Sequence, residues 1–300
     1  MTMHAQRKRF LIIANPSAGR KNARLVYHVA ETLARKGARA NVVETKTEQA
    51  ARTALLGAIH DIDTLVAAGG DGTIRALASV LGEKELALPL GIIPAGTGNV
   101  LANELGLPRN PEALAELLLN GTTRSARLMS ANGAPFLLMA SAGFDANVVM
   151  RLSMSLKQQI GRTAYAFPTA RELMHQPPAP FEVLLDGTPY VATWAIVANA
   201  RTYGGSFRLV PDASIFDDQL HAVLFGARTR RGRLKELLAL AAGHVEQCRS
   251  VHVIPCKQAL IRTPKHQPTQ ADGDALGFGP VEIKAMEQPV ALIIPETAKL

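Results

Sequence analysis

The stretch TLVAAGGDGTIRAL, residues 64–77, decides how this chain is organised. Its first half is an almost continuous apolar run, which is typical of a strand buried on both faces of a sheet. Its second half is expected to open a helix that runs to about Leu81, and the turn GGDGT joins the two. Glycine-rich turns that open helices usually hold phosphate. This one carries an acid, Asp71, so a positive charge must lie between acid and phosphate, or the turn has another purpose.

The same alternation of strand and helix extends over the first third of the chain. Further strands are expected at Phe10–Asn15, Ala38–Glu44 and Leu90–Gly96. Helices are expected from Lys21 to Lys36, with Gly37 as the stop, and from a cap at Thr47 to about Ile59. Apolar strands that alternate with helices predict an α/β nucleotide-binding domain with a parallel sheet, over residues 1–121.

From about Gly121 the pattern changes to short apolar runs separated by DG, GG and proline. This pattern predicts a β-sandwich-rich second domain over residues 122–288, interrupted by helices at about 146–175 and 231–244. The last apolar run, Val290–Pro295 in the segment 289–300, could return to the first domain as a strand.

The overall composition limits the possible partners. The 300 residues carry a formal net charge of +8, which favours nucleotides, nucleic acid or an anionic membrane surface. Only 5% of residues are aromatic and none interleave with basic residues, which argues against nucleic acid. Two cysteines favour a reducing cytoplasm over a disulfide framework. No apolar run approaches the roughly 18 residues of a membrane helix, and the first one is too short for a signal peptide.

Four polar or glycine-rich turns follow the predicted parallel strands: Asn15–Gly19, Glu44–Thr47, Gly69–Thr73 and Pro94–Asn99. Ligands of such sheets bind beyond the carboxyl ends of the strands, so we expect all four turns to face one crevice. The chain has no G-K dipeptide, no G-x-G-x-x-G and no G-x-S-x-G. This excludes a Walker A loop, the dinucleotide fingerprint and the usual hydrolase elbow.

Within GGDGT, each residue type suits an anion site. Gly69 and Gly70 let backbone N–H groups approach a ligand, and Gly72 and Thr73 would begin the helix. Asp71 is placed either as a simple N-cap or as a ligand for water on a Mg²⁺ ion that lies between the acid and a phosphate. The two roles are compatible.

The GGDGT turn, with NPSAGR (residues 15–20) before it and PAGTGN (residues 94–99) after it, resembles the diacylglycerol kinase catalytic domain family. This family includes bacterial lipid kinases and sphingosine kinases, while GGDGT is also shared with NAD kinases and, more loosely, phosphofructokinases. Segments similar to later family motifs follow in order at Ser141–Ala146, Gly204–Leu220 and Gln270–Gly277. The resemblance implies an α/β domain followed by a β-sandwich, with the active site in the cleft between them.

The resemblance also implies roles for individual residues. The ATP contacts would come from Asn15, Pro16, Ser17, Ala18, Gly19, Thr45 or Thr47, Gly69, Gly70, Asp71, Gly72, Thr73, Gly96 and Thr97. The family's late DGE turn supplies the catalytic base, which here becomes Asp274, with Asp272 as its neighbour; a plain DG hairpin is the alternative. A structural Mg²⁺ would be held by the Asp217 side chain and the carbonyls of Ser214 and Gln219, where the alternative is a solvated acidic turn.

The chain also departs from the family pattern. Ile74, Arg75 and Ala76 stand where many relatives continue with Asn-Glu, and Val100 stands where many have Asp. Asp218 replaces a frequent glycine. Asp145, in the segment similar to GFDA, would lie near the cleft or cap a helix.

Two further patterns are weaker. His244, Cys248, His252 and Cys256 recur every four residues, but a zinc site is disfavoured because a helix end and a strand need not share a face. Basic residues precede an apolar helix and also occur in the 146–175 stretch. These residues could lie on a solvated helix or bind anionic lipid headgroups. The first group is Arg228, Arg230, Arg231, Arg233 and Lys235, and the second is Arg151, Lys157, Arg162 and Arg171.

Together these patterns predict an ATP- and Mg²⁺-dependent lipid kinase of phospholipid metabolism, acting on diacylglycerol or a similar alcohol. It would work from the cytoplasm at the anionic inner face of the membrane. Two rivals remain: an NAD kinase-like phosphotransferase with a soluble substrate, and a nucleotide- or lipid-sensing module without turnover.

Overall fold

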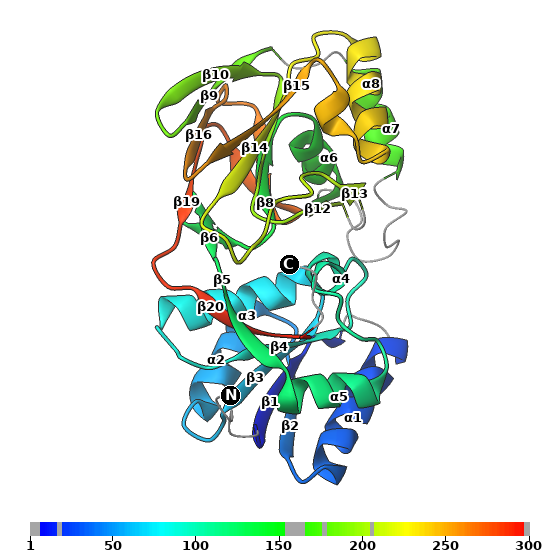
Figure 1. Ribbon diagram of the computed structural model, residues 1–300, viewed down its shortest axis with the longest axis vertical. Helices are drawn as coiled ribbons and strands as arrows, with labels where there is room; N and C mark the ends of the chain where they lie inside the picture. The colour runs from blue at the N-terminus through cyan, green and yellow to red at the C-terminus, as the bar shows by residue number, and fades with distance from the viewer. Residues whose placement is uncertain (1–6, 17–19, 154–165, 176–178, 205–206, 297–300) are drawn as a thin grey trace. The chain divides into compact units, whose positions relative to one another are not determined.

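A computed structural model describes residues 7–16, 20–153, 166–175, 179–204 and 207–296 (Figure 1). The chain forms two compact units. The first unit contains the residues up to Ala126 together with the segment from Glu287, and the second is Arg127–Met286.

The first unit is built on a six-stranded sheet in the order β2-β1-β3-β4-β20-β5. Neighbouring strands from β2 to β20 are parallel, and β5 runs antiparallel to β20. The strands are β1 (Arg9–Ala14), β2 (Arg39–Glu44), β3 (Thr64–Gly69), β4 (Leu90–Pro94), β5 (Thr122–Ala126) and β20 (Val290–Ile294). Every residue of β3 is buried, so the sheet is covered on both faces, as the sequence predicts.

Five helices accompany the described strands of this unit: α1 (Arg20–Arg35), α2 (Glu48–Ala58), α3 (Asp71–Glu83), α4 (Val100–Glu104) and α5 (Pro111–Asn120). Gly37 ends the first helix region with φ +84°, a conformation that glycine adopts without strain. Thr47 caps α2 as predicted, because its hydroxyl accepts a hydrogen bond from Ala50 N at 3.2 Å.

The outer strand β5 corrects the predicted domain boundary between residues 121 and 122. Strand β5 pairs with β20 along its whole length, so the first unit extends to Ala126. The sequence TTRSA of β5 is polar and mostly exposed, so it has no apolar pattern that would assign it to this sheet. The return of the last strand is confirmed, since β20 lies between β4 and β5.

The second unit contains two six-stranded antiparallel sheets, which confirms the predicted sandwich. Their orders are β10-β9-β16-β19-β6-β7 and β15-β14-β11-β8-β17-β18. The first comprises β6 (Met129–Ala131), β7 (Ala134–Phe136), β9 (Phe181–Leu185), β10 (Thr188–Ala192), β16 (Ala259–Arg262) and β19 (Val281–Ala285). The second comprises β8 (Met139–Ala142), β11 (Trp194–Ala198), β14 (Leu220–Phe225), β15 (Val251–Cys256), β17 (Pro268–Ala271) and β18 (Asp274–Phe278).

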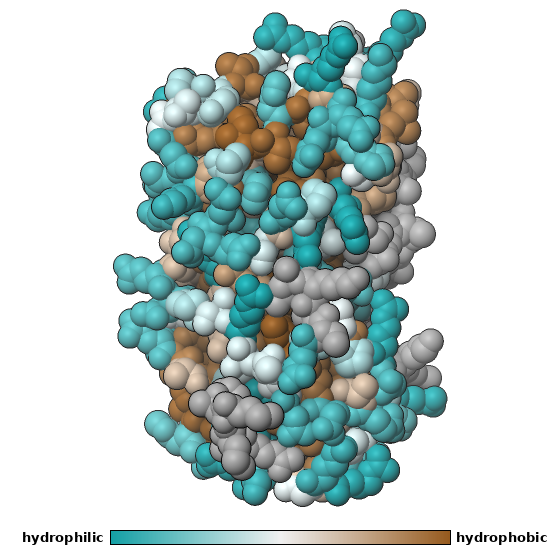
Figure 2. Space-filling model, viewed as in Figure 1, coloured by the Kyte–Doolittle hydropathy of each residue, from teal (hydrophilic) through white to brown (hydrophobic). Residues whose placement is uncertain are grey.

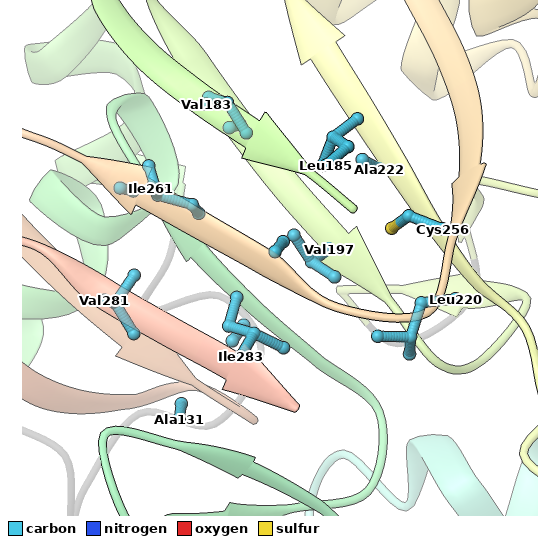
Figure 3. Packing of buried hydrophobic residues seen from close by; sticks show 14 of the residues in the cluster. Ala131, Val183, Leu185, Val197, Leu220, Ala222, Cys256, Ile261, Val281 and Ile283 are labelled. Carbon is cyan, nitrogen blue, oxygen red and sulfur yellow. The ribbon is translucent and has the colours of Figure 1, made fainter. Parts of the chain in front are cut away.

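The core of the sandwich is formed by inward-facing residues of both sheets. Figure 3 shows Val183, Ile261 and Ile283 of one sheet approaching Val197 and Leu220 of the other. These positions alternate with half-buried ones along strands such as β9, which is the period of a strand with one buried face.

Three α-helices are described in the second unit: α6 (Phe144–Ser153), α7 (Ala166–Met174) and α8 (Arg230–Ala241). The sequence predicts one helical stretch over 146–175, of which residues 154–165 lie outside the described part. A short β-ribbon, β12 (Thr202–Tyr203) with β13 (Phe207–Arg208), and the 3-10 helix η3 (Val245–Gln247) complete the unit. None of the helices, within the described ranges, is both long and apolar enough to cross a membrane.

Candidate functional site

The predicted nucleotide turns of the first unit share one edge of its sheet. Strands β1 to β4 are parallel, so their carboxyl ends lie together, and the register pairs Ala14 with Ala68 and Gly69 with Pro94. Backbone bonds tie the turns to neighbouring strands: Asn15 N donates to Ala68 O at 3.0 Å and Thr45 N donates to Ala14 O at 2.9 Å. The structure therefore brings together the turns that the sequence singles out.

The GGDGT and PAGTGN turns pack directly against one another. A Cβ on Gly96 would overlap the backbone of Gly70, and a Cβ on Gly69 would overlap the Thr73 side chain. Asn99, at φ +49°, closes its own turn: its Oδ1 accepts from Gly96 N at 2.9 Å and its Nδ2 donates to Gly96 O at 2.8 Å. Gly96 is therefore required for contact between the two turns, and Gly69 is required for the close approach of Thr73 within its own turn.

Asp71 does not cap its own helix, which corrects the simple N-cap interpretation. Gly70 is the N-cap of α3, and Asp71 is the first residue of the helix. Its carboxylate instead accepts hydrogen bonds from Val100 N at 3.0 Å and Leu101 N at 2.9 Å, at the start of α4. Position 100 contributes its backbone N–H, which explains how valine can stand there.

Mg²⁺ suits the remaining capacity of Asp71. Each carboxylate oxygen accepts one N–H and retains a further lone pair. The side chain is half-buried beside the sheet edge, and Mg²⁺ prefers oxygen ligands and usually keeps several waters. Asp71 is therefore better suited to hold a water molecule bound to Mg²⁺ than to coordinate the ion directly.

The start of α3 offers N–H groups to an anion. The first helical N–H groups with backbone partners belong to Thr73 and Ile74, which both donate to Gly70 O. The N–H groups of Asp71 and Gly72 precede this ladder. Gly72 is exposed, and no described atom lies within 4 Å of where its Cβ would be. The first turn of the helix therefore contains an exposed residue, where the helix dipole favours negative charge.

The other predicted nucleotide residues take different environments. Thr45 is buried at the end of β2, whereas the Thr47 hydroxyl is used as a helix cap. Asn15 and Pro16 are half-buried and Thr97 is exposed. The remaining predicted residues of the first turn, Ser17, Ala18 and Gly19, lie outside the described residues.

In the second unit, the DGD turn is a hairpin between β17 and β18. Asp272 has φ +48° and Gly273 has φ +81°, as the two central residues of a type I′ turn require. The Asp272 carboxylate accepts hydrogen bonds from the N–H groups of Leu137 (2.8 Å), Leu138 (2.9 Å) and Met139 (3.0 Å). Asp272 therefore anchors the turn to the start of β8, while Asp274, half-buried, begins β18.

A buried carboxylate, Asp145, supports this turn through a network that the sequence did not predict. Asp145 is 5% exposed and accepts hydrogen bonds from Ser141 Oγ (2.7 Å), Trp194 Nε1 (2.9 Å) and Gln270 Nε2 (3.1 Å). Burial raises its pKa, and these hydrogen bonds oppose the rise. Asp145 is the second residue of α6, so its carboxylate faces this network in place of the predicted N-cap role.

Gln270 connects the buried network to the hairpin. Its Nε2 donates to Ser141 Oγ at 2.6 Å and to Asp145, and its Oε1 accepts from Gly273 N at 2.9 Å. Two anchors, Asp272 and Gln270, thus hold the turn that precedes Asp274. The position of Gln270 two residues before the motif was the available sequence signal, but Ser141 and Asp145 are more than a hundred residues away along the chain.

The predicted structural metal pattern lies at one turn before β14. Asp217 and Gln219 are exposed, Ser214 is buried, and Asp217 N donates to Ser214 O at 3.1 Å. A carboxylate and two carbonyls are the kinds of oxygen ligand that Mg²⁺ prefers. The Ser214 carbonyl keeps one lone pair for such a role.

The His/Cys series forms no ligand group. Cys256 is buried in the sandwich core, where burial raises the pKa of its thiol to about 12, and His252 is exposed. Across the described residues no cluster of three or more His, Cys, Asp or Glu side chains could hold a metal ion.

Comparisons with known proteins cover both units. Residues 9–131 match the diacylglycerol kinase catalytic domain, and residues 139–294 match the YegS C-terminal NAD kinase beta sandwich-like domain. A diacylglycerol kinase of Mycobacterium tuberculosis is 32% identical over 242 residues, covering 78% of this chain and 77% of the relative. A diacylglycerol kinase of Bacillus subtilis is 28% identical over 302 residues, covering 96% and 97%.

The fold has solved relatives as well. The crystal structure of a putative diacylglycerol kinase from Bacillus anthracis superposes with a TM-score of 0.79 at 21% identity, covering 98% of this chain and 99% of that one. A probable lipid kinase YegS-like protein of Pseudomonas fluorescens is 32% identical over 182 residues, covering 60% of each chain.

Proposed function

Because the chain belongs to the diacylglycerol kinase catalytic domain family and is a lipid kinase, we propose that it transfers the γ-phosphoryl group of ATP to the hydroxyl of diacylglycerol or a similar lipid. The observation that carries the proposal is the shared sheet edge of the first unit. There the interlocked glycine turns leave the N-terminus of α3 open at Gly72.

The phosphates of ATP are assigned to this edge. Backbone N–H groups at the start of α3 and the helix dipole favour negative charge, and the exposed Thr97 hydroxyl lies in the facing turn. Asn15 and Pro16 border the same edge after β1. Because Gly70 and Gly96 pack against each other across the two turns, the donors are held in place before the nucleotide arrives.

Mg²⁺ would neutralise the charge on the transferred phosphoryl group when it is bound. Asp71 would hold it through water, with the carboxylate oriented by its bonds to Val100 and Leu101. Asp217, with the carbonyls of Ser214 and Gln219, is the proposed ligand set of a structural ion.

Asp274 is the proposed general base for the lipid hydroxyl. The transfer needs a group that accepts the hydroxyl proton as the oxygen attacks phosphorus. Asp274 is half-buried and follows a turn held at both central residues, so its backbone is fixed. Asp272 is assigned to positioning, because its own carboxylate is occupied by three backbone N–H groups.

The test is to incubate purified protein with γ-labelled ATP, Mg²⁺ and a total bacterial lipid extract in mixed micelles, and to identify labelled lipid by mass spectrometry. We expect a labelled lipid that Asp274→Asn abolishes and that Asp61→Asn, at an exposed acid of the first unit, leaves unchanged. Label on NAD or another soluble acceptor, without lipid label, would favour the NAD kinase-like rival. ATP binding without any product would favour the sensing module.

A further inference from the structure

Helices α7 and α8 of the second unit expose both basic and large apolar side chains. We define the α7–α8 surface by its exposed residues Arg171, Met174, His175, Arg228, Arg230, Arg231, Leu234, Lys235 and Leu238. The two helices pack side by side (Figure 1). The following inference rests on the proposed lipid kinase function and concerns where the enzyme meets its substrate.

Helix α8 is inverted relative to an ordinary surface helix. Its most buried side chains are charged: Arg233 is 3% exposed and Glu236 is fully buried. Two leucines point outward instead, Leu234 at 44% and Leu238 at 60% exposed. Surface helices normally turn their apolar stripe to the core and their charges to water. Two features of α8 therefore need a physical reason: the charged residues on its buried face and the leucines on its exposed face.

The inner side is explained by polar and aromatic partners. Arg233 lies 3.4 Å from Glu236 and donates to Thr193 Oγ1 at 3.1 Å, with its guanidinium 5.3 Å from the centre of the Phe144 ring. Glu236 also accepts from Ala227 N at 2.9 Å. These contacts fix the rotation of α8, because turning the helix would leave a buried pair unsatisfied.

Among the described residues of the unit, no contact explains why the two leucines face outward. Leu234 and Leu238 are one turn apart and lie in the middle of the exposed arc, with Arg230 on one flank and Arg231 and Lys235 on the other. Cations in the first turn of a helix oppose its dipole, so they do not serve the stability of α8.

Helix α7 continues the same chemistry. Met174 is 72% exposed, and Arg171 and His175 are exposed beside it. The two helices contain one acid each, Glu172 and Glu236, and both are buried. Every exposed acidic or basic side chain of α7 and α8 among the described residues is therefore basic. In Figure 2, hydrophobic surface appears at the place where Figure 1 draws these helices.

We propose that the α7–α8 surface is the site at which this chain docks on an anionic lipid bilayer. Its cations match the charge of acidic headgroups, while Leu234, Leu238 and Met174 can enter the boundary between headgroups and acyl chains. The net charge of +8 adds a favourable long-range attraction. A docked enzyme would meet a lipid alcohol within the membrane plane and need not extract it into water.

The first test measures partitioning onto vesicles of mixed phosphatidylglycerol and phosphatidylcholine, with pure phosphatidylcholine vesicles as reference. The variant Arg230→Gln/Arg231→Gln/Lys235→Gln should lower partitioning onto the anionic vesicles on the order of a hundredfold, at about fivefold per basic residue. The matched control replaces three exposed lysines elsewhere in the same unit, Lys257, Lys265 and Lys284, by glutamine. Equal losses in both triple variants would show that only overall charge matters and would overturn the proposal.

The second test addresses the leucines. Leu234→Gln/Leu238→Gln should lower partitioning at high salt, where the electrostatic contribution is screened. The control Val191→Gln/Phe278→Gln changes two comparably exposed apolar residues, on strands β10 and β18, and should bind as wild type does. If the leucine variant instead converts an oligomer to a monomer while vesicle binding persists, the surface is an interface between copies of the chain, and the proposal fails.

Kinase activity is followed in parallel with two forms of the acceptor, in vesicles and in detergent micelles. Surface variants should lose activity on vesicles and retain it in micelles. Wild-type docking without any phosphorylated lipid would defeat the kinase assignment and leave the docking surface standing. Phosphorylation of lipid without preferential binding to anionic vesicles would support the kinase assignment and overturn the docking proposal.

Discussion

The GGDGT turn of the first unit and the DGD turn of the second use an Asp-Gly pair in opposite ways. In GGDGT the glycines around Asp71 serve contact between two turns and open a helix N-terminus. In DGD the pair sits at positive φ and reverses a hairpin, so the residue after it, Asp274, begins a strand. In both turns the first acid is held by backbone N–H groups of a distant segment. An acid in a motif that resembles a catalytic one can thus act by organising the backbone, and substitutions can separate this role from a role in catalysis.

The largest effect is expected within the DGD turn. Asp274→Asn should lower kcat by about 10²- to 10⁴-fold, because the base is lost, while Tm stays within a degree or so of wild type. Asp272→Asn should lower both activity and Tm, since the amide keeps one acceptor oxygen for three N–H donors. Thermal melts and single-turnover assays on both variants test the separation. A large fall in Tm for Asp274→Asn would make that residue structural as well.

The next effect concerns Asp71. Asp71→Asn should destabilise the first unit by about 1.5–3 kcal/mol, because one of its two charge-assisted bonds to α4 is lost. If Asp71 also holds a magnesium-bound water, the Mg²⁺ concentration for half-maximal activity should rise. Denaturant unfolding measures the first effect and an Mg²⁺ titration of activity the second. An unchanged titration midpoint in a destabilised variant would limit Asp71 to its structural role.

Gly96→Ala and Gly72→Ala form a matched pair of glycine substitutions. Gly96→Ala should destabilise the first unit by about 1–3 kcal/mol, because its Cβ would overlap the Gly70 backbone. Gly72→Ala meets open space in a helix and should stabilise by about 0.5–1 kcal/mol. Urea unfolding of the two variants tests the comparison. Similar destabilisation in both would mean that the turns do not interlock as described.

The smallest effect is the pH dependence contributed by Asp145. Burial raises its folded-state pKa above the unfolded value, so its contribution to stability is present below the unfolded pKa and is lost as pH rises through the folded pKa. The Tm of Asp145→Asn relative to wild type should therefore increase with pH across that window. A Tm difference that is constant with pH would show that Asp145 does not titrate this way.

Much of the first unit could be predicted from the sequence because its signals are local. The apolar run of β3, the stop at Gly37 and the cap at Thr47 each depend on neighbouring residues alone. Strand β5 and helix α5 were missed: β5 has a polar edge sequence, and it is defined by pairing with β20, which comes at the other end of the chain.

The candidate site shows the same limit. The sequence places Asp71, Asp272 and Asp274 in motifs, but the partners of the first two lie 29 to 135 residues away along the chain. Asp145 and Gln270 had no pattern that linked them, since their contact exists only when β8, α6 and β17 come together.

By itself, the sequence determined the periodic elements, the turns at the ends of parallel strands and the family to which the chain belongs. These follow from residue types at short spacings. Only the tertiary structure decided from which N–H groups each acid accepts hydrogen bonds. It also decided that Arg233 lies on the buried face of α8 while Leu234 lies on the exposed face. The reason is physical: the rotation of a helix and the partners of a buried charge are set by the free energy of contacts between distant segments, which no local pattern contains.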